Sequence, residues 1–218
     1  MYTAYVKDTL KLYVGIVDSE PVKENAGDTA RTTIILRDFR GDKVKISFKN
    51  GKHGAPRYEM LADRIINAGV KEGTLLSVLA YCKDESKDVA TGLNFKYQGL
   101  WTFKGDEKTR PVSVLIGRAC NPREGISAKG QTPYFSIGVP VTEWKNGANV
   151  TRWINVVFMD KTQNGKEQKN ATNAKKVLDN SEKPIVIVTG GAIISSEYEG
   201  VENESLVGYR ILKAPTAN

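Results

Sequence analysis

Three aromatic residues, Trp144, Trp153 and Tyr198, lie in the second half of the chain, and the two tryptophans stand next to Lys145 and Arg152. An exposed aromatic ring can stack on a base, and a neighbouring cation can bind the phosphate of the same nucleotide. Trp144 precedes the pair Asn146-Gly147, which is typical of a tight hairpin turn. These residue types at these places predict a surface that binds unpaired nucleic acid.

The strand-like run 153–159 has two faces. Alternation puts Trp153, Asn155, Val157 and Met159 on one face, and Ile154, Val156 and Phe158 on the other. The second face is purely aliphatic and aromatic and makes the better core. We therefore expect Trp153 and Met159 to point outward.

Two of the aromatic residues have competing interpretations. Trp144 either stacks on a base or only covers its own hairpin, and we favour stacking because large exposed aromatic residues at loop tips usually serve binding. Tyr198 is flanked by acidic residues that would repel phosphates: Glu197, Glu199, Glu202 and Glu204. A tyrosine that only packs on its hairpin is as well supported there as one that stacks.

Phosphate contacts are expected from cations beside this face or in its loops. A single lysine or arginine is usually just a solvated charge, so only joint placement near Trp144 and Trp153 favours binding. The candidates are Arg118, Arg123, Lys129, Lys145, Arg152 and Lys161.

Composition agrees with an anionic partner. The chain has 218 residues, with 32 Lys plus Arg against 25 Asp plus Glu, a net charge of +7. Such a balance favours a polyanion, although it says nothing about fold. The length permits one large β-domain or two modules of about 100 residues each.

An internal repeat favours two modules. In each half we expect a first strand with a glycine (12–17 and 114–119), a second strand (32–36 and 134–141) and a third (44–48 and 153–159). An amphipathic helix follows, marked by Tyr58, Leu61, Ala62, Ile65 and Ile66 in one half and by Ala171, Ala174, Val177 and Leu178 in the other. A fourth strand (72–78 and 182–188) and a final strand (95–103 and 206–213) complete each half.

The order β-β-β-α-β-β, found twice, is that of the OB-fold. The sequence thus predicts an all-β protein of two tandem five-stranded Greek-key barrels, each with one helix between strands 3 and 4. We place the divergent first barrel at 1–104, a polar linker at 105–111 and the second barrel at 112–218.

The second half resembles a known family on specific residues. The segments 114–118, 153–157 and 198–200, together with Pro122, look like the bacterial single-stranded DNA-binding protein family, and the resemblance covers most of 112–213. It implies that Trp144, Trp153, Met159 and Tyr198 contact bases. Met159 departs from the family's phenylalanine and offers a softer contact.

The resemblance implies a non-catalytic, largely sequence-independent binder that protects single-stranded DNA in replication, recombination or transfer. Family members commonly end in an acidic tail that recruits replication and repair enzymes, whereas this chain ends with 213–218, Lys-Ala-Pro-Thr-Ala-Asn. That departure puts recruitment of replication or recombination proteins in doubt and, by analogy, favours a specialised protein of a phage or mobile element.

In the first half the interpretation relies on the repeat. Phe39 follows the second strand at a hairpin, roughly in the place of Trp144. Alternation puts Val44, Ile46 and Phe48 in the core and leaves lysines on the other face. The candidate nucleic-acid residues are Phe39, Arg37, Arg40, Lys43 and Lys45.

Other functional classes have little support. Cys82, Cys120 and a single histidine, His53, are too few for a Cys/His zinc site, and we expect two reduced packing cysteines. No nucleophile constellation or phosphate-cradling loop indicates an enzyme or a cofactor, and no segment resembles an export signal or a membrane span, so a cytoplasmic protein is expected. An RNA-binding barrel, an adaptor whose first barrel binds a protein, and a monomer or homodimer all stay open.

Overall fold

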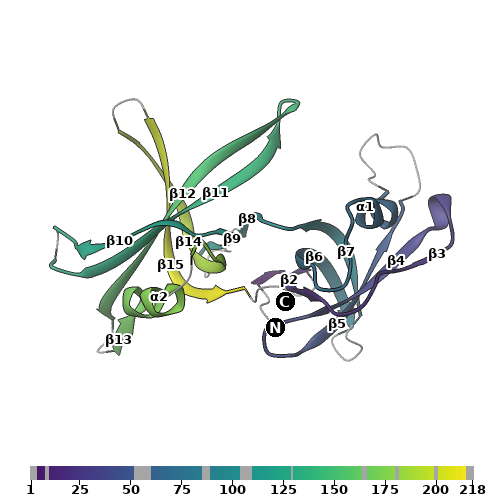
Figure 1. Cartoon of the computed structure of the whole chain (residues 1–218), viewed down its shortest axis with the longest axis horizontal. Helices are drawn as coiled ribbons and strands as arrows, with labels where there is room; N and C mark the ends of the chain where they lie inside the picture. The colour runs from purple at the N-terminus through teal and green to yellow at the C-terminus, as the bar shows by residue number, and fades with distance from the viewer. Residues whose placement is uncertain are drawn as a thin grey trace. The chain divides into compact units, whose positions relative to one another are not determined.

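The computed structural model describes residues 4–7, 10–51, 60–84, 89–103, 110–128, 130–163, 166–179, 182–198 and 201–214 (Figure 1). The chain divides into two compact units, Met1–Tyr97 with Pro215–Asn218, and Gln98–Ala214. Neither helix in the described ranges has the length and apolar character needed to cross a membrane.

The first unit is a closed barrel. Its elements are β1 (Ala4–Lys7), β2 (Leu10–Val17), β3 (Val22–Glu24), a 3-10 turn (Gly27–Thr29), β4 (Arg31–Arg37), β5 (Lys43–Lys49), α1 (Leu61–Asn67), β6 (Leu75–Asp84) and β7 (Val89–Lys96). The sheet runs β2-β6-β7-β5-β4, and β4 pairs back to β2. Strands β5 and β7 are parallel, and the other neighbours are antiparallel. This strand order, with α1 between the third and fourth barrel strands, is the OB-fold.

The second unit repeats that order with additions. It contains β8 (Gly99–Phe103), β9 (Val112–Arg118), β10 (Cys120–Ile126), β11 (Pro133–Lys145), β12 (Ala148–Gln163), β13 (Lys166–Lys169), α2 (Asn170–Leu178), β14 (Ile185–Tyr198) and β15 (Val201–Lys213). Only Ala119 separates β9 from β10, so the two form one bent first strand. Its first part pairs with β14 and its second with β11, while β12 and β15 are parallel. The predicted fold class, two tandem OB-folds, is confirmed.

The cores follow the predicted alternation. In β5, Val44, Ile46 and Phe48 are buried, while Lys43, Lys45 and Lys49 are exposed. In β12, Ile154, Val156 and Phe158 are fully buried. Phe48 is therefore a core residue, as its position in the alternation predicts.

One contact recurs in both barrels and marks the duplication. Gly92 on β7 and Gly208 on β15 lie so close to the rings of Phe48 and Phe158 that a Cβ on either glycine would overlap the ring. Each pair joins the third and fifth barrel strands, which run parallel.

The helices begin with a second shared device. The Asn50 side-chain oxygen accepts hydrogen bonds from the backbone N–H groups of Ala62 (3.0 Å) and Asp63 (3.4 Å). Asp160 accepts them from Ala171 (2.7 Å) and Thr172 (3.2 Å). Both acceptors follow the core phenylalanine by two residues, and both bond the second and third residues of the helix, whose N–H groups have no partner within the helix.

The prediction of one final strand over 95–103 in the first half is wrong. Strand β7 covers Val89–Lys96 and closes the first barrel, whereas β8 (Gly99–Phe103) pairs with β9 of the second unit. A bend at Tyr97 and Gln98 separates the two strands. Buried residues on both sides of this bend made the run look continuous, and Gly92 weakened the strand signal of β7.

The expected linker, 105–111, is only partly described by the structure. The division into two compact units falls between Tyr97 and Gln98. Residues 105–109 are not among the described residues, so the linker at 105–111 stays a prediction. Tyr58, expected at the start of the first helix, also lies outside the described part, and Ile66 of that helix is 37% exposed.

Candidate nucleic-acid interface

In the second unit, the β11–β12 hairpin and β15 are neighbours in one sheet, joined through the middle of β12 (Figure 1). The register pairs Pro140 with Trp153, Gly138 with Asn155, Ser136 with Val157, and Tyr134 with Met159. Side chains directly opposite in a sheet share a face, so Trp153 and Met159 lie on one surface, as the alternation predicts. We call these eight residues the aromatic face.

The ring of Trp153 lies over Gly138 on the neighbouring strand. A Cβ built at Gly138 would stand 3.2 Å from the ring carbon Cε3, so only a glycine leaves the indole this room. Trp153 is nevertheless 54% exposed. One side of the indole therefore rests on the sheet, and a large part of it is open to a ligand.

The backbone positions of Trp144 and Tyr198 belong to the same surface by register. Trp144 pairs with Asn149 next to the turn at Asn146 and Gly147, both of which have positive φ, as an Asn-Gly hairpin turn requires. Tyr198 pairs with Val201 at the tip of the β14–β15 hairpin. Their side chains are outside the described part, so their stacking roles stay predictions.

Two predicted cations flank the aromatic face. Arg123 is exposed and lies opposite Ser136 on β10, so it shares this surface. Lys161 is exposed and follows Met159 by two residues on β12. Arg118 is exposed at the end of β9, where its guanidinium donates to the carbonyl of Lys183 at 2.9 Å. Lys129 and the side chain of Lys145 lie outside the described part.

Arg152 differs from the other candidates because its side chain points to the opposite side of β12. Its guanidinium bonds Glu204 on β15 and Glu143 on β11, the latter at 3.3 Å. Burial by itself would lower the pKa of Arg152, but the two carboxylates more than offset it and raise the pKa above its usual value. The structure therefore brings Arg152 to two carboxylates and not to the aromatic face.

The first unit carries a face of different chemistry. The outward residues of β4 and β5 pair as Arg31 with Lys49, Thr33 with Ser47, Ile35 with Lys45, and Arg37 with Lys43. We call these eight residues the basic face. Like charges directly opposite each other destabilise a sheet. Two such cation pairs on one hairpin therefore suit a bound polyanion.

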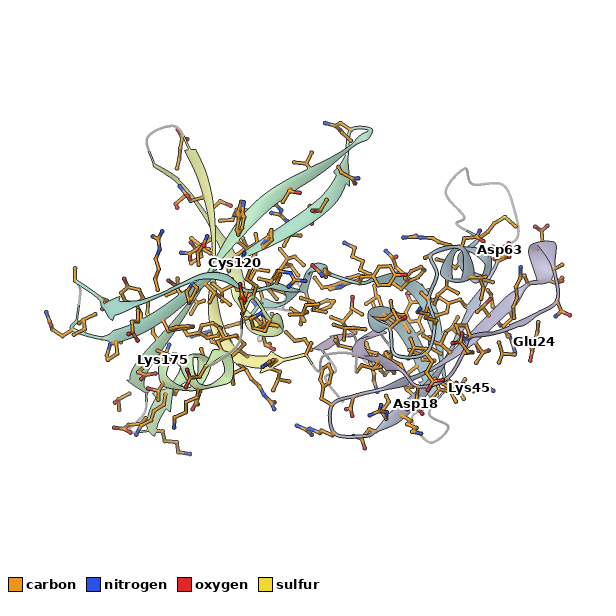
Figure 2. All side chains as sticks on the ribbon, in the orientation of Figure 1. Asp18, Glu24, Lys45, Asp63, Cys120 and Lys175 are labelled. Atoms are coloured by element: carbon orange, nitrogen blue, oxygen red, sulfur yellow. The ribbon has the colours of Figure 1, made fainter. Side chains whose placement is uncertain are left out.

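One carboxylate partly neutralises the basic face. Asp18, labelled in Figure 2, binds Lys43 and Arg37, each at 2.6 Å. Hydrogen bonds from Lys43 and then from Arg37 lower the pKa of Asp18. Within the part of the chain that the structure describes, Arg31, Lys45 and Lys49 engage in no ion pair. The alternation 31, 33, 35, 37 could have added Arg31 to the predicted residues.

The hairpin between β4 and β5 holds the other two candidates. The Asp38 side chain accepts backbone N–H bonds from Arg40 and Asp42, each at 2.9 Å, and fixes the turn. Arg40 is exposed and Phe39 half-buried on this turn. Phe39 therefore occupies the hairpin between the second and third barrel strands, as Trp144 does in the second unit.

Among the described residues, no group of three or more His, Cys, Asp or Glu side chains could hold a metal ion. Cys82 is a buried packing residue of β6, and Cys120 is half-buried; neither forms a disulfide. His53 lies outside the described residues.

Comparison with known proteins gives structural matches alone. No family model matches the chain, and no curated protein does. A deletion mutant of the single-stranded DNA binding protein from Thermus aquaticus matches with 11% identity over 95% of each chain, at a TM-score of 0.33. A small single-stranded DNA-binding protein from Streptomyces coelicolor matches 48% of this chain and 94% of its own, with 18% identity and a TM-score of 0.31.

A replication protein A heterotrimer bound to ssDNA also matches, with 12% identity over 97% of this chain and 50% of that chain, at a TM-score of 0.28. At these TM-scores the alignments add nothing to the fold, which rests on the strand order of each unit.

Proposed function

We propose that this protein binds single-stranded DNA without catalysing a reaction, by stacking bases on the aromatic face and holding phosphates with lysine and arginine. The observation that carries the proposal is Trp153, a 54% exposed indole supported from below by Gly138. Stacking a base on this ring would remove its exposed apolar surface from water. A stacked base is worth about 1–3 kcal/mol by alanine substitution.

The geometry favours unpaired strands. In a duplex each base is already stacked on its neighbours, whereas a single strand can turn its bases onto a ring. Arg123 and Lys161 border the aromatic face and would contact phosphates. Each phosphate contact releases counterions, so binding should weaken as salt rises.

The basic face of the first unit extends the same proposal. Its exposed cations, chiefly Arg31, Lys45 and Lys49, would bind the phosphates of the strand. No aromatic side chain belongs to this face, so its contribution should be electrostatic and tolerant of base identity.

The finer parts of the proposal concern residues and setting. Trp144 and Tyr198 would stack further bases at the tips of the two hairpins, with Phe39 at the corresponding turn of the first unit. The protein would coat and protect single strands in replication, recombination or transfer of a phage or mobile element, as a monomer or homodimer in the cytoplasm.

Tryptophan fluorescence tests the proposal. Titration with oligothymidylate, a matched duplex and oligouridylate, at low and high salt, should show saturable, salt-sensitive quenching by the DNA strand. Trp153→Ala should weaken binding, whereas Trp101→Phe, which removes a tryptophan from β8, should lower the signal and keep the affinity.

Three outcomes would redirect the proposal. Absence of quenching and of any mobility shift with all three ligands would refute it. Preference for oligouridylate would move the partner to RNA, which is distinguished by its 2′-OH. If Trp153→Ala and the unsubstituted protein bind with equal affinity, stacking on Trp153 does not contribute to binding, and the aromatic face is not the binding site.

A further inference from the structure

The aromatic face has a second group of rings at the end away from Trp153. Tyr134 on β11 lies directly opposite Met159 on β12. On the other side, Tyr209 follows Val207 by two residues on β15, as Met159 follows Val157 on β12, and Val157 pairs with Val207. Tyr134 is therefore the cross-strand partner of Met159, and Tyr209 lies on β15, two residues beyond the last pair that joins β12 and β15.

Both tyrosines rest on glycines in the same way as Trp153. A Cβ at Gly125 on β10 would stand 2.9 Å from Tyr134 Cε1, and a Cβ at Gly191 on β14 would stand 2.6 Å from the Tyr209 hydroxyl oxygen. Three aromatic residues of one surface thus each lie across a glycine of a neighbouring strand.

An aromatic ring over a glycine can have a purely structural role, because the ring covers backbone that would otherwise be open to solvent. That role alone does not explain Tyr209, because 45% of this residue stays exposed. Neither the Tyr134 nor the Tyr209 hydroxyl is hydrogen-bonded within the described part of the chain. By contrast, the exposed Tyr97 in the first unit donates its hydroxyl to the Ala68 carbonyl at 2.6 Å, which explains its place.

We propose that Tyr134, Met159 and Tyr209 form a second base-binding position on the same face. This inference rests on the proposed function and adds residues to it. Trp153 and Met159 are six residues apart on one strand, a separation of about 20 Å at about 3.4 Å per residue. One single strand running along β12 would reach Trp153 first and the tyrosines several nucleotides later.

The surroundings suit a nucleotide at this second position. Arg123, opposite Ser136, is one cross-strand pair from Tyr134, and Lys161 follows Met159 by two residues. Met159, opposite Tyr134 on the neighbouring strand, adds a polarizable thioether to this part of the face. Bases would meet the tyrosine rings while the two cations hold the phosphates.

The test separates stacking from structural cover by two substitutions at each tyrosine. Tyr209→Leu and Tyr134→Leu keep apolar bulk over the glycine but remove the ring, whereas Tyr209→Phe and Tyr134→Phe keep the ring. Affinity for a long oligothymidylate should fall about 5- to 150-fold in each Leu variant, the range that corresponds to loss of one stacked base, and should stay within twofold in the Phe variants. Val150→Ala, an exposed aliphatic side chain on the opposite face of β12, is the control and should bind as the unsubstituted protein does.

A strand without bases completes the experiment. An abasic oligonucleotide of equal length offers the same phosphates, so the Leu variants should bind it as well as the unsubstituted protein does. Equal affinity of both Leu variants and the unsubstituted protein for oligothymidylate, with Trp153→Ala still impaired, would overturn the second position and leave the proposed function standing. Loss of affinity in the Phe variants as well, with unchanged circular dichroism, would also overturn the second base-binding position. Failure of the unsubstituted protein to bind any DNA strand would instead refute the proposed function itself.

Discussion

Arg152 binds Glu204 across the parallel strands β12 and β15, beside Ile154 and Glu204, the first backbone pair that joins the two strands. The same guanidinium reaches Glu143 on β11, so one cation links three strands where the two long hairpins diverge. This position explains why an arginine next to Trp153 in sequence is not part of the aromatic face.

Replacing Arg152 should therefore affect stability more than binding. Its side chain is 35% exposed, and solvent screens such a pair, so Arg152→Met should lower the free energy of unfolding by about 1 kcal/mol. The slope of log affinity against log salt should not change. If Arg152 instead contacts a phosphate of the single strand, the slope should fall by about 0.7, and Lys161→Met gives the reference for such a loss.

The contact between Gly138 and Trp153 predicts an effect on ligand binding at a residue that need not touch the ligand. Because a Cβ at Gly138 would stand 3.2 Å from the indole, Gly138→Ala should tilt the ring and weaken oligothymidylate binding severalfold. In a Trp153→Ala background the same substitution should have little further effect, because coupled residues are not additive. Additive effects of the two substitutions would show that Gly138 acts independently of the ring.

Much of this architecture follows from the sequence because the signals are local. Alternation in 153–159 identified both the buried face and the outward Trp153 and Met159. The order of strands and helix, which occurs once in each half, predicts the OB-fold without knowledge of any long-range contact. Strand alternation depends on neighbouring residues alone, so it survives even where the two halves have diverged.

The remaining features depend on register, which local patterns do not give. Tyr134 becomes the partner of Met159, and Tyr209 comes to the same surface, only when β11 and β15 are aligned on β12. The role of Arg152 depends on Glu204, which is 52 residues away in sequence. The final strand of the first half was misplaced because two buried segments flank the bend at Tyr97, and sequence alone does not show which sheet each one joins.

The glycine beneath each core phenylalanine should be essential for packing. A methyl group at Gly208 would overlap the Phe158 ring, which is fully buried and cannot move aside cheaply. Gly208→Ala should cost about 1–3 kcal/mol of stability, and Gly92→Ala should cost a similar amount through Phe48. Chemical denaturation measures both, with Gly125→Ala, which meets only a partly exposed tyrosine, as the comparison; equal small losses at all three sites would contradict the overlap.

Helix α2 should depend on a side chain that belongs to β12. Asp160 accepts the N–H groups of Ala171 and Thr172, and the residue before the helix, Lys169, provides no side-chain cap. Asp160→Ala should destabilise the second unit by about 0.5–2 kcal/mol, while Asp160→Asn, which keeps an acceptor oxygen as Asn50 does in the first unit, should lose less. Equal losses in the two variants, measured by thermal unfolding, would argue against the cap.

Asp18 should act as an internal competitor of the nucleic-acid strand. Its carboxylate holds Arg37 and Lys43, two cations of the basic face, at 2.6 Å each. Asp18→Asn would release both from an anion, so affinity for oligothymidylate at low salt should rise, and the salt dependence should steepen as further counterions are released on binding. Glu24→Gln, which removes a carboxylate opposite Arg31, is the matched control for added net charge. Equal gains in affinity in both variants would show that net charge alone, and not release of Arg37 and Lys43, sets the affinity.

The Asp18 carboxylate should also contribute to the dependence of stability on pH. The pKa of Asp18 is lowered in the folded protein, so its contribution to stability is present above the ordinary aspartate pKa and is lost as pH falls through the lowered value. Asp18→Asn should therefore make the free energy of unfolding fall less steeply as pH is lowered through the acid range.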